Sequence, residues 1–192
     1  MRLETTHAGE GTGGEALVFG LAGLIAGFTC HWAPAPAFLA VPVPSGMTTV
    51  QVNVFPALVF VVLLAAAVFL TRAAERLNQG IGMWVVGAVA TVGIYILVVG
   101  LLTFGYFSQL FGLTDSLWWL NFALSGAIGA ALVGMVAGTL AGTMAQSLFL
   151  AMLVCGAISG LAAFSPLFLF PWWQTSMGLL IGLWFHRAAA AE

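Results

Sequence analysis

The stretch LWWLNFALSGAIGAALVGMVAGTL, residues 117–140, decides the fold of this chain. It contains no Asp, Glu, Lys or Arg. It also exceeds the roughly 20 apolar residues that a helix needs to cross the hydrocarbon core of a bilayer. A charge-free apolar run of this length predicts a membrane-spanning helix.

The composition of the whole chain agrees with that stretch. Of 192 residues, 62% are hydrophobic and 5% are charged, whereas a soluble domain carries about 25% charged residues. Four arginines, six acidic residues and no lysine cannot cover the surface of a soluble protein of this size. The composition therefore predicts an integral membrane protein. It also excludes nucleic-acid binding through a basic surface, because four scattered arginines cannot neutralise a phosphate backbone.

Apolar runs divide the chain into six expected spans. We predict an all-α, multi-pass membrane protein with a polar tail at 1–15, a single six-helix membrane domain at 16–187 and a short tail at 188–192. The connection 32–52 is apolar but rich in proline, so we expect no continuous helix there and a position along the membrane interface. The expected transmembrane helices are residues 16–31, 53–70, 81–104, 117–140, 145–164 and 167–186.

The arginines predict the orientation. With six spans, both chain ends lie on the same side as the loop 71–80 and the turn 141–143, and every arginine falls on that side. Arginine-rich loops are cytoplasmic, so we expect an N-in, C-in topology. Abundant Ala and Gly with no Lys indicate a prokaryotic cytoplasmic (inner) membrane. Residues 1–15 hold one Arg against three Glu, which does not favour a cleaved signal peptide. The four arginines are Arg2, Arg72, Arg76 and Arg187.

No formally charged side chain lies within any expected span. Ion pumping, proton coupling and voltage sensing usually depend on such residues, and a retinal Schiff base needs a lysine. His31 and His186 fall at opposite membrane faces, so they cannot form a bis-histidine haem site. Cys30 and Cys155 have no metal-ligand spacing. We therefore expect no cofactor and no metal, and the residues do not favour an enzyme.

Small residues form a ridge at four-residue intervals along the fourth span. Such ridges let helix backbones approach closely in lipid. Two interpretations stay open: packing within the bundle, and contact with a partner subunit. The ridge consists of Gly126, Ala130, Gly134, Gly138 and Gly142.

Uncharged polar residues gather in the outer half of the expected bundle. One interpretation is a polar cavity that binds a ligand, and the other is ordinary hydrogen bonding between helices. These candidate binding residues are Asn53, Asn121, Ser125, Ser159, Gln174 and Thr175.

Residues 123–128, ALSGAI, resemble the G-x-S-G serine motif that rhomboid intramembrane proteases carry in the fourth of six spans. Residues 175–182, TSMGLLIG, are similar to the family's H-x-x-G-x-x-x-G in the sixth span, and the turn 74–76 resembles its charged turn. The resemblance implies a rhomboid-like fold with Ser125 at the nucleophile position. Thr175 replaces the family's histidine, and a serine needs an adjacent base to attack. The resemblance therefore implies a scaffold without protease activity.

Together these features predict a non-catalytic membrane scaffold or subunit that packs with other membrane proteins. Two alternatives stay open. One is a transporter, or a substrate-binding membrane component, for a neutral or amphiphilic small solute. The other is a rhomboid-like intramembrane protease or pseudoprotease. The expected partners are the lipid bilayer and other membrane-protein subunits, with no nucleic acid.

Overall fold

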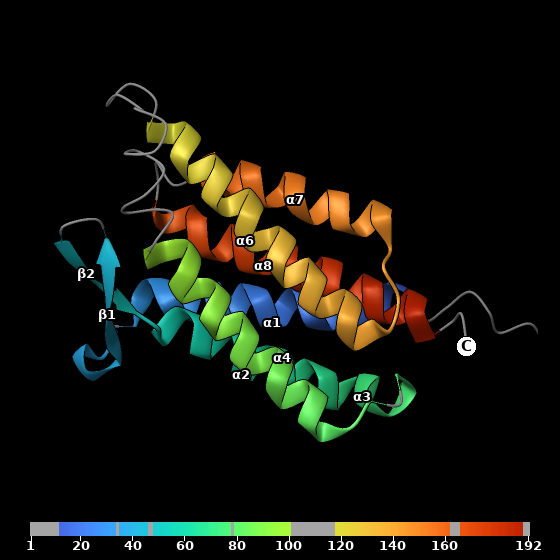
Figure 1. Cartoon of the computed structure of the whole chain (residues 1–192). Helices are drawn as coiled ribbons and strands as arrows, with labels where there is room; N and C mark the ends of the chain where they lie inside the picture. Colours follow the sequence, from blue (N-terminus) through green and yellow to red (C-terminus); the bar gives the residue numbers. More distant parts are fainter. Residues whose placement is uncertain are drawn as a thin grey trace, which may run out of the picture.

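Helices dominate the computed structural model, which describes residues 12–33, 35–45, 48–77, 79–100, 118–161 and 166–189 (Figure 1). Each of the six predicted spans contains a long helix, so the all-α prediction is confirmed. The long helices are α1 (Thr12–Trp32), α2 (Phe55–Leu70), α4 (Ile81–Ile96), α6 (Trp118–Ala141), α7 (Gln146–Leu161) and α8 (Pro166–Ala189).

Two helical stretches are long and apolar enough to cross a membrane, Ile81–Gly100 and Trp119–Ala141. Shorter apolar helices occupy Gly14–Cys30, Phe55–Leu70 and Gln146–Leu161. By length and composition, the described residues therefore supply two candidate membrane spans. The six-span topology stays a prediction.

The connection between α1 and α2 contains an antiparallel hairpin that we did not predict. A single 3-10 turn, η1 (Ala37–Leu39), leads into β1 (Ala40–Ser45), which pairs with β2 (Thr48–Asn53). Pro42 faces Gln51 in the register. A two-stranded ribbon tolerates proline because each strand has a free edge. The valines are β-branched and alternate with other residues in both strands, which suits a pleated surface.

Asn53 occupies a different place from the predicted one. It was expected to start the second span, but it ends β2, and α2 begins at Phe55. Its carboxamide oxygen accepts a hydrogen bond from the Phe55 N–H at 2.9 Å, and its amide donates to the Pro36 carbonyl at 2.9 Å. Asparagine often bonds the backbone two residues on in this way. This bond satisfies a free N–H at the start of the helix.

The third predicted span, 81–104, begins where the structure places it, and its helical stretch continues to Gly100. The α-helical pattern of α4 ends at Ile96, and residues 97–100 continue as a wider π turn. The predicted end, 101–104, lies outside the described residues. A β-carbon on Gly100 would lie 2.7 Å from a methyl group of Val43, so the hairpin packs directly against this end of α4.

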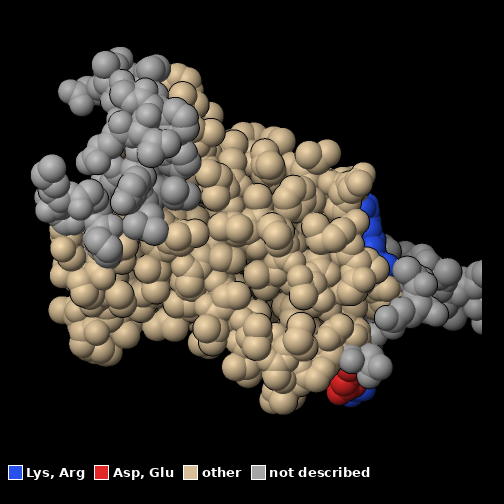
Figure 2. Space-filling view, in the orientation of Figure 1, with Lys and Arg blue, Asp and Glu red and all other residues tan. Residues whose placement is uncertain are grey.

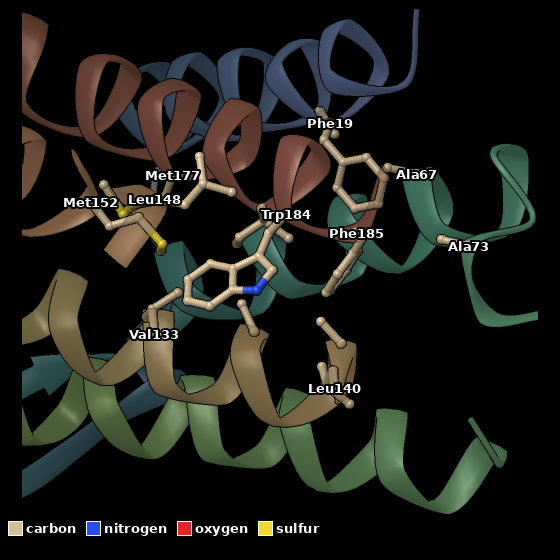
Figure 3. Packing of buried hydrophobic residues seen from close by; sticks show 14 of the residues in the cluster. Phe19, Ala67, Ala73, Val133, Leu140, Leu148, Met152, Met177, Trp184 and Phe185 are labelled. Carbon is tan, nitrogen blue, oxygen red and sulfur yellow. The ribbon is translucent and has the colours of Figure 1, made fainter. Parts of the chain in front are cut away.

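Glycines bring α1 and α8 into backbone contact. A β-carbon on Gly23 would overlap the Gln174 carbonyl, and one on Gly178 would overlap the Phe19 carbonyl. Close approach of this kind is the usual role of small residues in lipid. Next to this contact, Trp184, Phe185 and Met177 of α8 form the centre of the apolar core (Figure 3).

Charged side chains gather at one end of the bundle. In Figure 2 the blue and red atoms lie at the end that carries the short helix α3 (Ala73–Arg76), and the rest of the visible surface is uncharged where it is described. The hairpin lies at the opposite end (Figure 1). We call these the charged end and the hairpin end. At the charged end, Nδ1 of His186 lies 3.1 Å from a carboxylate oxygen of Glu15.

Candidate functional site

A cavity of about 300 Å³ lies between α2, α4, α6 and α8, toward the hairpin end. Its walls are mostly apolar and include Phe60, Phe122 and Trp173. Two of the predicted binding residues line it, Ser125 of α6 and Gln174 of α8. We call it the Ser125–Gln174 cavity. Its volume is at the low end of the roughly 300–1,000 Å³ typical of small-molecule sites.

The Ser125 hydroxyl is buried without a hydrogen-bond partner among the described residues, and its residue is 2% exposed. This differs from the usual behaviour of serine and threonine in a helix, which bond the carbonyl four residues earlier. Seven other side chains of the described helices and their ends do so: Thr29, Thr71, Thr91, Thr139, Ser159, Thr175 and Ser176.

Of the two polar side-chain atoms of Gln174, only the nitrogen has a hydrogen-bond partner among the described residues. Its side-chain nitrogen donates to the Pro56 carbonyl at 3.4 Å, which ties α8 to α2. Its side-chain oxygen is buried and accepts no bond from the residues placed in the structure. A buried polar atom without a partner costs about 1–3 kcal/mol. A ligand that donates a hydrogen bond to this oxygen would recover that energy.

The other predicted binding residues are elsewhere. Asn53 holds the hairpin against α2. Ser159 donates to the Cys155 carbonyl at 2.6 Å, and Thr175 donates to the Pro171 carbonyl. Asn121 is buried one turn before Ser125 but does not line the cavity. The predicted cluster therefore divides into two cavity residues and several that serve local structure.

Sequence reasoning missed two hydroxyl side chains of this cavity, Thr91 and Tyr95 of α4. They lie four residues apart in an otherwise apolar helix, which places them on one face. That spacing was the available signal. Neither was singled out, because an isolated Thr or Tyr in a membrane helix has many structural explanations.

The described lining of the cavity is uncharged. It contains no Asp, Glu, His, Cys, Lys or Arg. Ser125 therefore has no general base there, and His186 is engaged with Glu15 at the charged end. Across the described ranges, no group of three or more His, Cys, Asp or Glu side chains lies close enough together to hold a metal ion.

A second cavity of about 630 Å³ lies between α2, α4, α6 and α8 toward the charged end. Trp84 lines it, and its indole nitrogen is buried without a partner within the described part of the chain. The Trp84 ring packs edge-on against Phe185, with ring centres 5.4 Å apart. Glu75, which is exposed, and Gln79 also line the cavity. We call it the Trp84 cavity.

The small-residue ridge of α6 packs mainly inside the chain. A β-carbon on Gly126 would overlap the Gly156 carbonyl of α7, and Ala130 is fully buried. Gly134 faces Phe149 and Met152 of α7.

The last two residues of the ridge, Gly138 and Gly142, differ from the others in what lies near them. Gly138 faces Met144 and the Trp184 ring of α8. Gly142 has a φ of 68° and no atom within 4 Å of its β-position, so it ends the helix rather than packing. The ridge therefore supports the interpretation of packing within the bundle.

Comparisons with protein-family models, curated proteins and solved structures found no match to this chain.

Proposed function

We propose that this chain is an integral membrane protein that spans the bilayer six times and binds a neutral small molecule in the Ser125–Gln174 cavity. One observation carries the binding proposal: two buried polar atoms without a partner among the described residues, the Ser125 hydroxyl and the Gln174 oxygen, border the same apolar cavity. Both can accept a hydrogen bond, and only the hydroxyl can donate one. The ligand that fits has an apolar body with an amide or hydroxyl group.

The scaffold prediction has less support than this binding role. That prediction rests on the absence of charge from the expected spans, on the absence of a cofactor ligand set and on small-residue ridges that could meet a partner subunit. Gly126 and Gly134 instead face α7, and Gly178 faces α1. A rhomboid-like arrangement without proteolysis is compatible with the binding role, because Ser125 and α8 border one cavity whose described lining contains no base.

The six-span topology predicts opposite accessibility for the two ends of the bundle. In a variant without Cys30 and Cys155, we would introduce Gln51→Cys in the hairpin or Glu75→Cys near α3, both exposed positions. A membrane-impermeant maleimide added to intact cells should label the hairpin variant alone, because arginine-rich loops stay in the cytoplasm. Permeabilised cells should show labelling of both. Equal labelling of both variants in intact cells would contradict the topology.

Binding can be tested with radiolabelled N-acetylphenylalanine amide, which is neutral and carries amide donors and acceptors on an apolar body. Ser125→Ala should raise the Kd of this amide about 2- to 12-fold in equilibrium dialysis, the range for the loss of one neutral hydrogen bond. The same change should leave thermal stability equal or higher, because it removes a buried hydroxyl that has no partner.

The matched control is Ser159→Ala. Ser159 is also buried, but its hydroxyl bonds Cys155 and does not line the cavity. Its loss should leave the Kd unchanged. The charged analogue N-acetylphenylalanine should not bind, because the cavity offers its carboxylate no compensating charge. Absence of saturable amide binding, or equal weakening by both alanine variants, would contradict the proposed site.

A further inference from the structure

One face of α4 lines either the Trp84 cavity or the Ser125–Gln174 cavity along almost the whole length of the helix. The residues involved recur at intervals of three and four, which is one stripe of a helix. From the first to the last, the stripe extends about 26 Å at 1.5 Å per residue, close to the roughly 30 Å of a bilayer core. The stripe is Ile81, Trp84, Ala88, Thr91, Tyr95 and Val98.

The two cavities meet beneath this stripe. Thr91 of α4 and Val133 of α6 line both of them. The Thr91 hydroxyl already donates to the Gly87 carbonyl at 2.8 Å, and Val133 is apolar. The junction is therefore an uncharged boundary between two hollow regions.

Weak packing of α4 agrees with this hollow interior. Gly87 is the only buried residue of Ile81–Ile96. By contrast, α1 and α8 meet backbone to backbone. The bundle is thus tightly packed on one side and open along α4.

Unpartnered polar atoms lie on both sides of the junction. Trp84 offers a donor in one cavity, and Ser125 and Gln174 offer a hydroxyl and an acceptor in the other. A neutral amide both donates and accepts, so it can form a hydrogen bond at each place. Without such bonds, moving an amide into an apolar medium costs several kcal/mol.

From this arrangement we infer that the two cavities are halves of one passage beneath α4, and that the protein moves a small neutral amide or alcohol with an apolar body across the membrane. The inference rests on the proposed binding function and adds transport to it. The ligand binds in the Ser125–Gln174 cavity, passes between Thr91 and Val133, and leaves through the Trp84 cavity, which Glu75 and Gln79 also line. Movement is downhill, because the ligand is neutral and the two residues that line both cavities, Thr91 and Val133, are not ionisable.

The test uses the full chain reconstituted in liposomes, with uptake of radiolabelled N-acetylphenylalanine amide compared with protein-free liposomes. Ala88→Phe places a ring in the Trp84 cavity without touching the other cavity. We expect it to lower uptake about tenfold or more, because the added ring overfills the passage, and to leave the Kd of the amide unchanged. The matched control is Ala90→Phe on the same helix, at a position that lines neither cavity; its uptake should match that of the unmodified chain.

Trp84→Phe serves as a second variant if Ala88→Phe fails to fold. It removes the unpartnered N–H and should lower uptake about 2- to 12-fold, the range for one hydrogen bond. Saturable binding without uptake above protein-free liposomes would overturn the passage and leave the binding proposal standing. Wild-type uptake by both Ala88→Phe and Trp84→Phe would also overturn it. Absence of amide binding would instead refute the proposed function itself.

Discussion

Replacing Gly126 with leucine should prevent α6 and α7 from packing and so lower the stability of the whole bundle. A β-carbon on Gly126 would overlap the Gly156 carbonyl, and a β-carbon on Gly156 would overlap the Gly126 carbonyl. Because both obstacles are backbone atoms, no side-chain rotation relieves them. Overpacked cores lose about 1–3 kcal/mol, occasionally more, and we expect this variant at or above the top of that range. Thermal unfolding in detergent measures the loss.

Reaction of a thiol-specific dye with Cys30 and Cys155 provides the readout, since both are free and partly buried. The matched control is Gly93→Leu in α4, where a β-carbon meets nothing within 4 Å. Leucine is a better helix former than glycine by several tenths of a kcal/mol, so this control should unfold at the same or a higher temperature. Equal destabilisation of the two variants would show that α6 and α7 do not meet at Gly126.

The helices could be predicted because each coincides with an apolar run. The ends of the helices could not be predicted, because single side-chain hydrogen bonds and tight turns determine where each helix begins and ends. Asn53 looked like the start of a span, yet its side chain caps α2 from the end of a strand. The hairpin was not predicted, because Pro42 and Pro44 exclude a helix without indicating a strand. The alternating valines of 41–43 and 50–52 do not stand out, because the residues around them are also mostly apolar.

The candidate site was predictable in part for a different reason. Polar residues in apolar helices stand out, so Ser125 and Gln174 were found. Whether a hydroxyl bonds its own helix or borders a cavity depends on helix rotation and rotamer, and Ser125 and Ser159 look alike in sequence. Trp84 was missed because an indole in an apolar helix carries no sequence signal of an unpartnered N–H.

The pairing of helices was beyond sequence reasoning as well. Four of the six predicted spans carry glycines four residues apart, and any two of them could have met. The structure pairs α1 with α8 and α6 with α7. The carbonyls that these glycines meet include those of Gly126 and Gly156, but also those of Phe19, Phe122 and Gln174, which no glycine pattern identifies. Shape over a whole interface, rather than spacing along one helix, selects the partner.

Trp184→Ala should be the most damaging change in the apolar core at the charged end. Trp184 is 0% exposed, and its ring lies against the face of α6 that carries Gly138 (Figure 3). Its indole N–H donates to the Thr143 carbonyl at 3.0 Å, which holds the turn after α6 against α8. Replacing a buried Trp with Ala costs about 3–5 kcal/mol in protein cores. In the proposed membrane setting, lipid reduces the part of this cost that comes from transfer out of water, so we expect about 3 kcal/mol.

A pair of Trp→Phe variants separates the hydrogen bond from the ring. Trp184→Phe keeps most of the ring and loses the bond to Thr143, so it should cost about 1–3 kcal/mol through the unpaired carbonyl. Trp84→Phe removes an indole N–H that has no partner within the described residues, while a ring remains against Phe185. It should be neutral or slightly stabilising, because a buried donor without a bond is itself unfavourable. If Trp84→Phe proved as costly as Trp184→Phe, the Trp84 indole would have a partner, and the Trp84 cavity would not hold a free donor for a ligand.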